Sequence, residues 1–266
     1  MRTAKPRRRV LLSSASVFPE PLDAAFELAH ELGYDGLEVM IWGDPASQDA
    51  AAIAELIQVA QLPVGSVHAP CLLITARVWG TEPGPKLTKS VRLAHQIGAR
   101  TVVVHPPFRW QSRYAREFAA GVRALERQSG RVIAVENMFP ARVGARGVSA
   151  YAPHWDVTRG PFEHLTLDTS HTSVARCDSA EMLARMGERL AHVHLADGTG
   201  KGTDEHLVPG RGSSGCDRVL HALPASFTGD VVVEVSTRNL DRERRAADLA
   251  EALRFARTHL AAPPPS

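Results

Sequence analysis

The sequence is poor in cysteine, nearly balanced in charge and without a long apolar run, and each feature excludes a class of protein. Its three cysteines, Cys71, Cys177 and Cys216, are an odd number without C-x-x-C spacing, which indicates a reducing compartment rather than a disulfide framework. The net charge of +2 provides no field over the whole molecule that would attract nucleic acid or a membrane. The N-terminal run LLSSASVF is too short for a signal peptide or a membrane span. We therefore expect a cytoplasmic protein without a membrane partner.

Two signals of domain structure are also missing. No G-x-G-x-x-G follows the first strand-like run, so nothing supports a dinucleotide-binding fold. No linker rich in Pro, Gly or Ser divides the 266 residues. We predict one domain over residues 10–260, with a basic, flexible tail at 1–9 and a disordered tail at 261–266.

The chain contains eight runs rich in Val, Ile and Leu that alternate with amphipathic stretches, at intervals of about 30 residues, the size of one βαβ step. Strands are predicted at 10–16, 36–40, 63–70, 101–107, 131–138, 163–171, 190–197 and 229–237. Helices are predicted at 22–32, 48–60, 86–98, 112–128, 179–189 and 241–260. Near-continuous apolar strands are typical of a parallel sheet buried on both faces. Eight such units predict an α/β fold, a single (β/α)8 TIM barrel.

Side chains that can bind metal follow most of these strands. The residues are Glu38, His68, His105, Glu136, Asp168, His171, His194 and Glu234, with Asp204 and His206 in the loop after the seventh strand. In a (β/α)8 barrel the C-terminal strand ends surround one axis and form the active site. Imidazoles and carboxylates gathered there indicate a divalent metal site.

Some of these residues have simpler explanations. Glu38 is at least as well explained as a helix cap or the partner of an arginine. His68 and His105 each precede a proline-bearing turn (HAP and HPP), where a histidine can serve as a structural hydrogen-bonding group. His192 lies on the same strand face as His194, one layer deeper, and we interpret it as a core or supporting residue.

The segments ELGYDGLEVM, VHAP, VVVHPP, VENM, LDTSH, HVHLAD, EHLVPGRG and VVVEVS together resemble the xylose isomerase-like barrel superfamily over nearly the whole chain. This superfamily includes sugar and sugar phosphate isomerases and epimerases, and also endonuclease IV-type nucleases that act at abasic sites. Resemblance to the isomerase branch implies that one divalent ion (Mn, Co, Mg or Zn) is held by Glu136, Asp168, His194 and Glu234. It also implies that the two glutamates move a proton on and off carbon while the metal stabilises an enediolate.

The same resemblance implies a small carbohydrate as substrate: a sugar, a sugar phosphate or a related polyhydroxy ketone. His171 and Arg211 resemble residues that hold the remaining substrate oxygens, and His68 and His105 would complete the binding ring. After the fourth strand, Arg109 could meet a phosphate and Trp110 could stack on a sugar face. The exposed helices of such barrels are also compatible with a homo-oligomer.

Resemblance to the endonuclease IV branch gives an alternative, a zinc-dependent phosphodiesterase with up to three ions. Its matching ligands would be His68, His105, Glu136, Asp168, His171, His194, Asp204, His206 and Glu234. DNA is expected as a partner only under this alternative. The segment IWGDPASQ after the second strand does not resemble the DNA-penetrating loop of that branch, and the net charge is nearly neutral. A barrel that binds a ligand without turnover is the third and least favoured class, because clustered carboxylates and imidazoles without metal would destabilise the fold.

Overall fold

The computed structural model describes residues 8–70, 75, 77–143 and 146–261. Cys71 and most of both predicted tails lie outside these residues. Arg8 and Arg9, the last two residues of the predicted N-terminal tail, are anchored. Arg8 donates to the backbone oxygens of Leu223 and Pro224, and Arg9 makes a bidentate pair with Asp230 at 2.7 and 2.8 Å.

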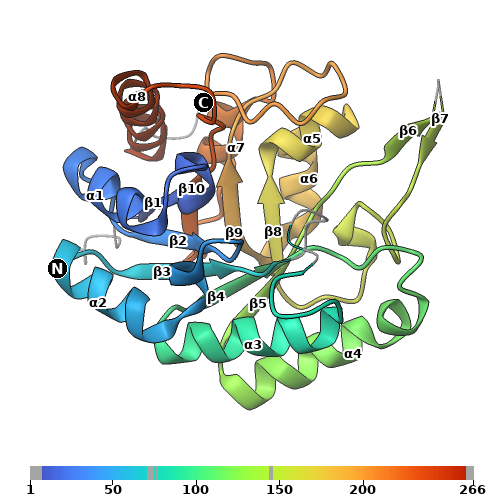
Figure 1. Ribbon diagram of the computed structural model, residues 1–266. Helices are drawn as coiled ribbons and strands as arrows, with labels where there is room; N and C mark the ends of the chain where they lie inside the picture. The colour runs from blue at the N-terminus through green and yellow to red at the C-terminus, as the bar shows by residue number, and fades with distance from the viewer. Residues whose placement is uncertain (1–7, 71–74, 76, 144–145, 262–266) are drawn as a thin grey trace, which may run out of the picture.

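Eight parallel strands form a closed barrel, so the predicted (β/α)8 fold is confirmed (Figure 1). The order around the barrel is β1-β10-β9-β8-β5-β4-β3-β2, and β2 pairs with β1 to close it. Each strand lies within its predicted range. The bounds are β1 Val10–Ser13, β2 Leu37–Met40, β3 Val64–His68, β4 Thr101–Val104, β5 Val132–Glu136, β8 Leu165–Asp168, β9 Leu190–Leu195 and β10 Asp230–Val233.

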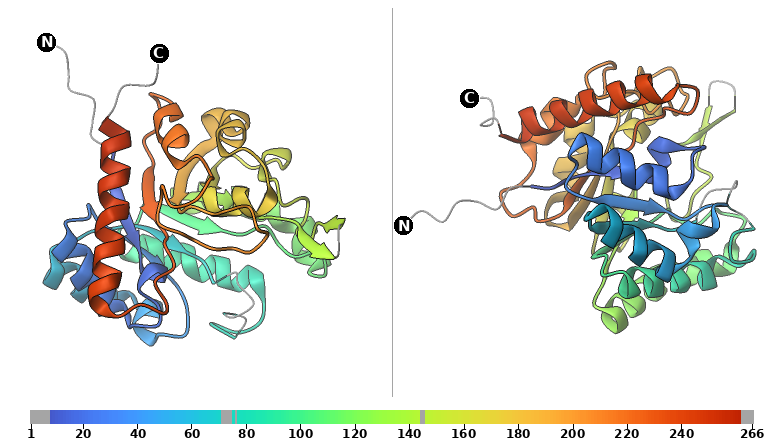
Figure 2. Two further views of the ribbon diagram at one scale, coloured as in Figure 1. Left: turned by 90° about the horizontal axis from the view of Figure 1, so that it is seen from above. Right: turned by 60° about the vertical axis from the view of Figure 1, so that its left-hand side comes forward.

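The helices lie outside the strands and cover the barrel (Figures 1 and 2). Their bounds are α1 Leu22–Leu32, α2 Ala50–Ala60, α3 Pro83–Gln96, α4 Ser112–Ser129, α5 Thr169–Ala175, α6 Ser179–Met186, α7 Cys216–Ala222 and α8 Arg242–Ala261. Short 3-10 turns lie at η1 Ser14–Val17, η2 Pro45–Gln48, η4 Val157–Arg159 and η5 Gly187–Arg189. Gly33 ends α1 in the left-handed region, at a φ of 79° that a residue without Cβ adopts readily. Asp49 and Asp178 cap α2 and α6 through their side chains.

The structure differs from the prediction in three places. The sixth predicted strand, 163–171, ends at Asp168, whose carboxylate accepts from the backbone N of His171 at 2.8 Å and starts α5. The hairpin of β6 (Ala141–Val143) and β7 (Arg146–Val148) projects away from the barrel in Figure 1 and has no alternating apolar pattern to reveal it. No helix was predicted at α7, which is only seven residues long and follows a Gly- and Ser-rich segment.

The barrel interior contains polar side chains, although branched apolar residues usually fill this space. Glu38, Ser66, His192 and His194 are each 0% exposed, while the outward-facing Val and Leu side chains pack against the helices. A buried carboxylate destabilises a fold unless it is paired. Among the described residues, no helix is both long and apolar enough to cross a bilayer.

Candidate active site

Four residues from neighbouring strands meet at the C-terminal end of the barrel. Glu136 ends β5, Asp168 ends β8, His194 lies in β9 and Glu234 follows β10, and one ligand atom of each lies within 4.8 Å of the others. The strand register brings these residues together. Asp168 on β8 is directly opposite His194 on β9. On the other side of β9, Val232 of β10 is opposite His194, and Glu234 follows two residues later. These are the four residues predicted from the sequence to hold one divalent ion.

The donor atoms of this quartet fit a cation. Nδ1 of His194 lies 3.1 Å from Glu234 Oε2, 3.2 Å from Glu136 Oε1 and 3.8 Å from Asp168 Oδ2. One ring nitrogen can donate only one proton, so it cannot satisfy three carboxylates. Oδ2 of Asp168 is buried without a hydrogen-bond partner among the described residues. A divalent ion held between these oxygens and Nδ1 would satisfy all of them.

The charges around the quartet also favour a cation. Burial raises the pKa of Asp168 to about 6, although His171 and His206 lower it. Burial works against protonation of His194, but the carboxylates of Glu234 and Glu38 hold its pKa well above the usual range. Ionised carboxylates therefore create a negative potential that draws positive charge into the site.

Three further predicted histidines surround Glu136. Its Oε2 lies 3.1 Å from both His68 Nε2 and His105 Nε2, and its Oε1 lies 3.3 Å from His171 Nδ1. Burial would raise the pKa of Glu136, but His194 and His105 outweigh it and hold the pKa well below the usual range. With 1% exposure and imidazoles on both oxygens, Glu136 is an ionised and firmly oriented carboxylate.

The loop between β9 and α7 brings Asp204 and His206 to the same cluster. Oδ2 of Asp204 lies 3.1 Å from His206 Nε2 and 3.3 Å from His171 Nε2. Ser170 Oγ donates to the other oxygen of Asp204 at 2.8 Å. His206 adopts a φ of 45°, in the left-handed region, and its Nδ1 lies 2.7 Å from the backbone oxygen of Glu234.

Two residues that position this loop and the quartet were not singled out from the sequence. Asp197 accepts hydrogen bonds from the backbone N of Gly210, Gly212 and Ser214, and so folds the Gly-rich turn. Asn137 donates to the backbone oxygen of Asp168 and accepts from its backbone N, which fixes that strand end. An Asp before a Gly-rich loop and an Asn beside a predicted ligand are weak sequence signals for such roles.

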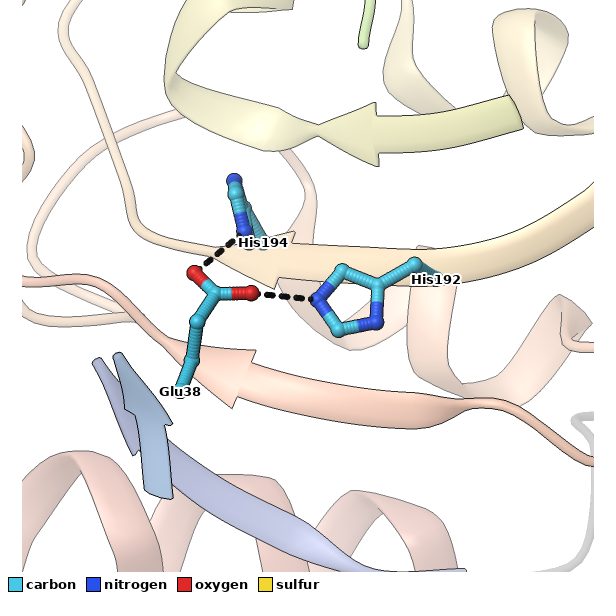
Figure 3. Close-up of side chains that lie close together, drawn as sticks. All are labelled: Glu38, His192 and His194. Atoms are coloured by element: carbon cyan, nitrogen blue, oxygen red, sulfur yellow. Dashed lines mark hydrogen bonds and ion pairs between the residues drawn. The ribbon is translucent and has the colours of Figure 1, made fainter. Parts of the chain in front are cut away.

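The interpretation of Glu38 as a helix cap or the partner of an arginine is wrong. Its side chain points into the barrel, where it accepts from His192 Nε2 at 3.0 Å and His194 Nε2 at 2.9 Å (Figure 3). It also accepts from Ser66 Oγ at 2.8 Å. His192 is fully buried beneath His194, as expected for a core or supporting residue. Burial opposes ionisation of Glu38, but the charge of His194 and the bonds from both histidines hold its pKa well below the usual range.

The structure does not bring Arg211 into the cluster. Its guanidinium pairs with Asp248 at 2.7 Å and Glu251 at 2.6 Å on the outer helix α8. The reason is local: the turn held by Asp197 directs this side chain away from the strand ends, a direction that sequence periodicity does not specify in a Gly-rich loop.

Trp110 and Arg109 lie on the loop after β4. Trp110 is 64% exposed and stacks on Phe108 with 4.3 Å between ring centroids, and Phe108 stacks in turn on Tyr151. A pocket of about 130 Å³ lies between Trp110 and His105, one of the histidines around Glu136. Arg109 is exposed, and its backbone N donates to the oxygen of Ala150.

The comparison with known families agrees with this fold. A family model described as the xylose isomerase-like TIM barrel matches residues 26–259. The chain belongs to the xylose isomerase-like TIM barrel family. Among curated proteins of this family, the uncharacterized proteins Rv0498 of Mycobacterium tuberculosis and ML2432 of Mycobacterium leprae are each 50% identical over 277 residues. Each alignment covers 96% of this chain and 99% of the relative.

Solved structures with the same fold include sugar epimerases. A D-tagatose 3-epimerase-like protein superposes with a TM-score of 0.69 at 22% identity, covering 95% of this chain and 100% of its own. The D-allulose 3-epimerase from Methylomonas sp., solved with D-allulose, gives a TM-score of 0.67 at 19% identity, with coverage of 97% and 99%. The IOLI protein, solved with a zinc atom, gives 0.68 at 16% identity, with coverage of 96% and 100%. At these identities the likeness shows the fold alone.

Proposed function

We propose that the chain is a divalent-metal-dependent isomerase or epimerase that acts on a sugar, a sugar phosphate or a related polyhydroxy ketone. The observation that carries this proposal is the quartet of Glu136, Asp168, His194 and Glu234, with a buried oxygen of Asp168 that has no hydrogen-bond partner among the described residues. Membership of the xylose isomerase-like family and the epimerases among the structural neighbours support it.

The quartet would hold one ion, for which Mn²⁺, Co²⁺, Mg²⁺ and Zn²⁺ are all compatible with carboxylate and imidazole ligands. When bound, the ion would polarise a substrate carbonyl and stabilise the negative charge that develops as a neighbouring C–H proton leaves. Removal and return of that proton fall to carboxylates of the chain itself.

Glu234 and Glu136 are the candidates for this proton transfer, and their surroundings differ. Both oxygens of Glu136 contact imidazoles, so this carboxylate is fixed and ionised. Glu234 is 8% exposed and, within the described part of the chain, makes one ion-pair contact, from Oε2 to His194 Nδ1 at 3.1 Å. Glu234 is thus freer to approach a substrate carbon and take its proton on a carboxylate oxygen. Glu136 is the candidate to protonate carbon from another side, with a proton that it first receives from one of the imidazoles on its oxygens.

Substrate hydroxyl groups would be bound by the imidazoles of His68, His105 and His171. Imidazole can donate or accept a hydrogen bond, which suits the hydroxyls of a polyol. The exposed ring of Trp110, backed by Phe108, offers an apolar face beside the pocket that His105 lines. A substrate phosphate, if present, would be met by the exposed Arg109 on the same loop.

Replacing Trp110 by Ala is expected to raise KM about three- to tenfold and to leave kcat almost unchanged. A stacked ring contributes about 1 kcal/mol of binding in the ground state and the transition state alike, which raises KM alone. Steady-state kinetics on the ketose that is turned over measure this. Arg211→Ala is the matched control, since its side chain pairs with α8, and should change neither constant. A fall in kcat with unchanged KM in Trp110→Ala would contradict the assigned role.

One observation favours a second candidate, a zinc-dependent phosphodiesterase of the endonuclease IV type. The structure also gathers His68 with Glu136 and His194, and Asp168 with His171 and His206, each as a group whose ligand atoms lie within 4.8 Å of one another. Such groups could hold additional ions. Against it, the loop after β2 folds on itself: Trp42 N donates to Ser47 Oγ and Gln48 Nε2 donates to the oxygen of Trp42. This loop therefore presents no extended arm toward a duplex.

Solvent exchange separates the two candidates. Protein loaded with Mn²⁺ or Co²⁺ is incubated in D₂O with a panel of ketoses that includes D-allulose and D-tagatose, and deuterium at carbon is followed by NMR. We expect incorporation at the carbon beside the carbonyl. Zinc-loaded protein is tested in parallel on an abasic-site duplex. Cleavage of the duplex without deuterium incorporation in any ketose would replace the isomerase proposal with the phosphodiesterase.

A further inference from the structure

We infer that Glu38 is a positioning residue for the metal centre: its carboxylate keeps a proton on Nε2 of His194 and so leaves Nδ1 able to coordinate. This inference rests on the proposed metal-dependent function. Glu38 and His194 are both 0% exposed, so bulk solvent does not compete for their hydrogen bond of 2.9 Å. Figure 3 shows Glu38 reaching from one strand to both histidines of another.

The two nitrogens of His194 face different partners. Nε2 faces Glu38 Oε1, whereas Nδ1 faces Glu234 and Glu136 at 3.1 and 3.2 Å within the quartet. An imidazole that binds a divalent ion needs one nitrogen without a proton, and its other N–H usually donates to a carboxylate or carbonyl. A proton held on Nε2 by Glu38 directs the lone pair of Nδ1 toward the carboxylates of the quartet.

The contact depends on closure of the barrel. Glu38 lies on β2 and His194 on β9, and β1 and β10 separate these strands in the sheet. Their side chains therefore meet across the interior rather than along a strand pair. Among the described residues, no contact joins Glu38 to the three carboxylates of the quartet. Glu38 therefore acts through His194.

The two oxygens of Glu38 carry unequal numbers of hydrogen bonds. Oε2 accepts from Ser66 Oγ at 2.8 Å and His192 Nε2 at 3.0 Å, whereas Oε1 accepts from His194 and from no other residue that the structure describes. In Glu38→Gln we expect the amide oxygen at the Oε2 position, because two donors meet it there and only one at the Oε1 position. The amide nitrogen then lies opposite His194 Nε2. That N–H needs an acceptor, so the proton of His194 moves to Nδ1, where it blocks coordination.

Calorimetric titration of metal-free, full-length protein with Mn²⁺ tests this, using wild type, E38Q, S66A and the double variant. We expect E38Q to weaken Mn²⁺ binding about 10- to 100-fold. S66A removes one donor to Oε2 only and should bind as wild type does. The double variant should recover part of the lost affinity, because the amide oxygen is no longer held at the Oε2 position by the hydroxyl. Thermal unfolding checks that all four proteins are folded.

The tautomer itself is measured by ¹⁵N NMR of Zn²⁺-loaded protein with labelled histidine. We expect a protonated Nε2 on His194 in wild type and loss of that signal in E38Q. Unchanged Mn²⁺ affinity in E38Q, or equal losses in E38Q and S66A, would overturn the role of Glu38 while the metal site stands. Wild type that binds neither Mn²⁺ nor Zn²⁺ would overturn the proposed function, and the role of Glu38 with it.

Discussion

Turnover by Glu234→Gln is expected to fall at least about a thousandfold, while the fold stays intact. The amide has the shape of the carboxylate but cannot take a proton from carbon, and positioned general bases contribute about 10²- to 10⁴-fold. The substitution would also remove a negative charge beside His194 Nδ1 and a charged ligand of the ion, which would add to this effect. Rates on the active ketose and deuterium exchange in D₂O measure the chemistry, and circular dichroism checks the fold.

The metal content of Glu234→Gln must be measured in the same preparation, because Glu234 is also a candidate ligand. Metal retained with activity lost identifies Glu234 as the base. Glu251→Gln is a matched control, since Glu251 is 40% exposed on α8, where it pairs with Arg211. Activity of Glu234→Gln within tenfold of wild type would remove the assigned role.

Asp168→Asn is expected to weaken metal binding about 100-fold or more without destabilising the metal-free fold. Oδ1 of Asp168 caps α5 by accepting from His171 N at 2.8 Å, and Asn serves this role equally well. The substitution therefore removes the charge on Oδ2, the buried oxygen without a hydrogen-bond partner among the described residues. Because the raised pKa of Asp168 shows that burial outweighs the attraction of His171 and His206, removal of this charge should leave the metal-free protein as stable as wild type or more so.

The sign of the pH dependence follows from the raised pKa of Asp168. Burial lifts this pKa from 3.8 to about 6, so the metal-free folded state binds a proton more tightly than the unfolded chain does. Ionisation of Asp168 therefore lowers the free energy of unfolding of wild type. The loss begins at about pH 4, grows as the pH rises and is complete above about pH 6. The gain in stability of metal-free Asp168→Asn over wild type should therefore be absent below about pH 4 and greatest above about pH 6.

Melting of metal-free protein across this pH range, together with Mn²⁺ titration, measures both effects. Asp178→Ala is a matched control, because Asp178 caps α6 and belongs to no group of metal-capable side chains among the described residues. It should cost about 1 kcal/mol of stability and leave metal affinity unchanged. Normal metal affinity in Asp168→Asn would contradict its place in the quartet.

The barrel could be predicted because it follows from features local to each strand, and the resemblance to the xylose isomerase-like superfamily singled out the quartet among the residues at the strand ends. Each strand is a short apolar run, and each ligand stands within one residue of the end of a strand, as Asp168 and Glu234 do. Parallel closure then brings the ends together. The start of α5 was missed because Asp168 serves as both strand end and helix cap, a distinction that the apolar pattern of LTLDTSH does not contain.

Glu38 and Arg211 could not be placed because their surroundings depend on distant parts of the chain. The two histidine partners of Glu38 are 154 and 156 residues away, on a strand across the barrel, so a lone carboxylate at a strand end gave no sign of them. The direction of Arg211 is set by the backbone of a turn that Asp197 folds. Strand periodicity indicates which face a side chain takes but carries no such information for a loop.

Metal content per chain tests the central claim most directly. Protein purified without chelator or added metal is analysed for its elements, then stripped and reloaded with Mn²⁺ or Co²⁺. We predict about one exchangeable ion per chain, with ketose turnover lost on chelation and restored on reloading. About three firmly held zinc ions, with cleavage of an abasic-site duplex, would contradict the isomerase account in favour of the phosphodiesterase. A chain that binds no metal even after reloading would contradict both.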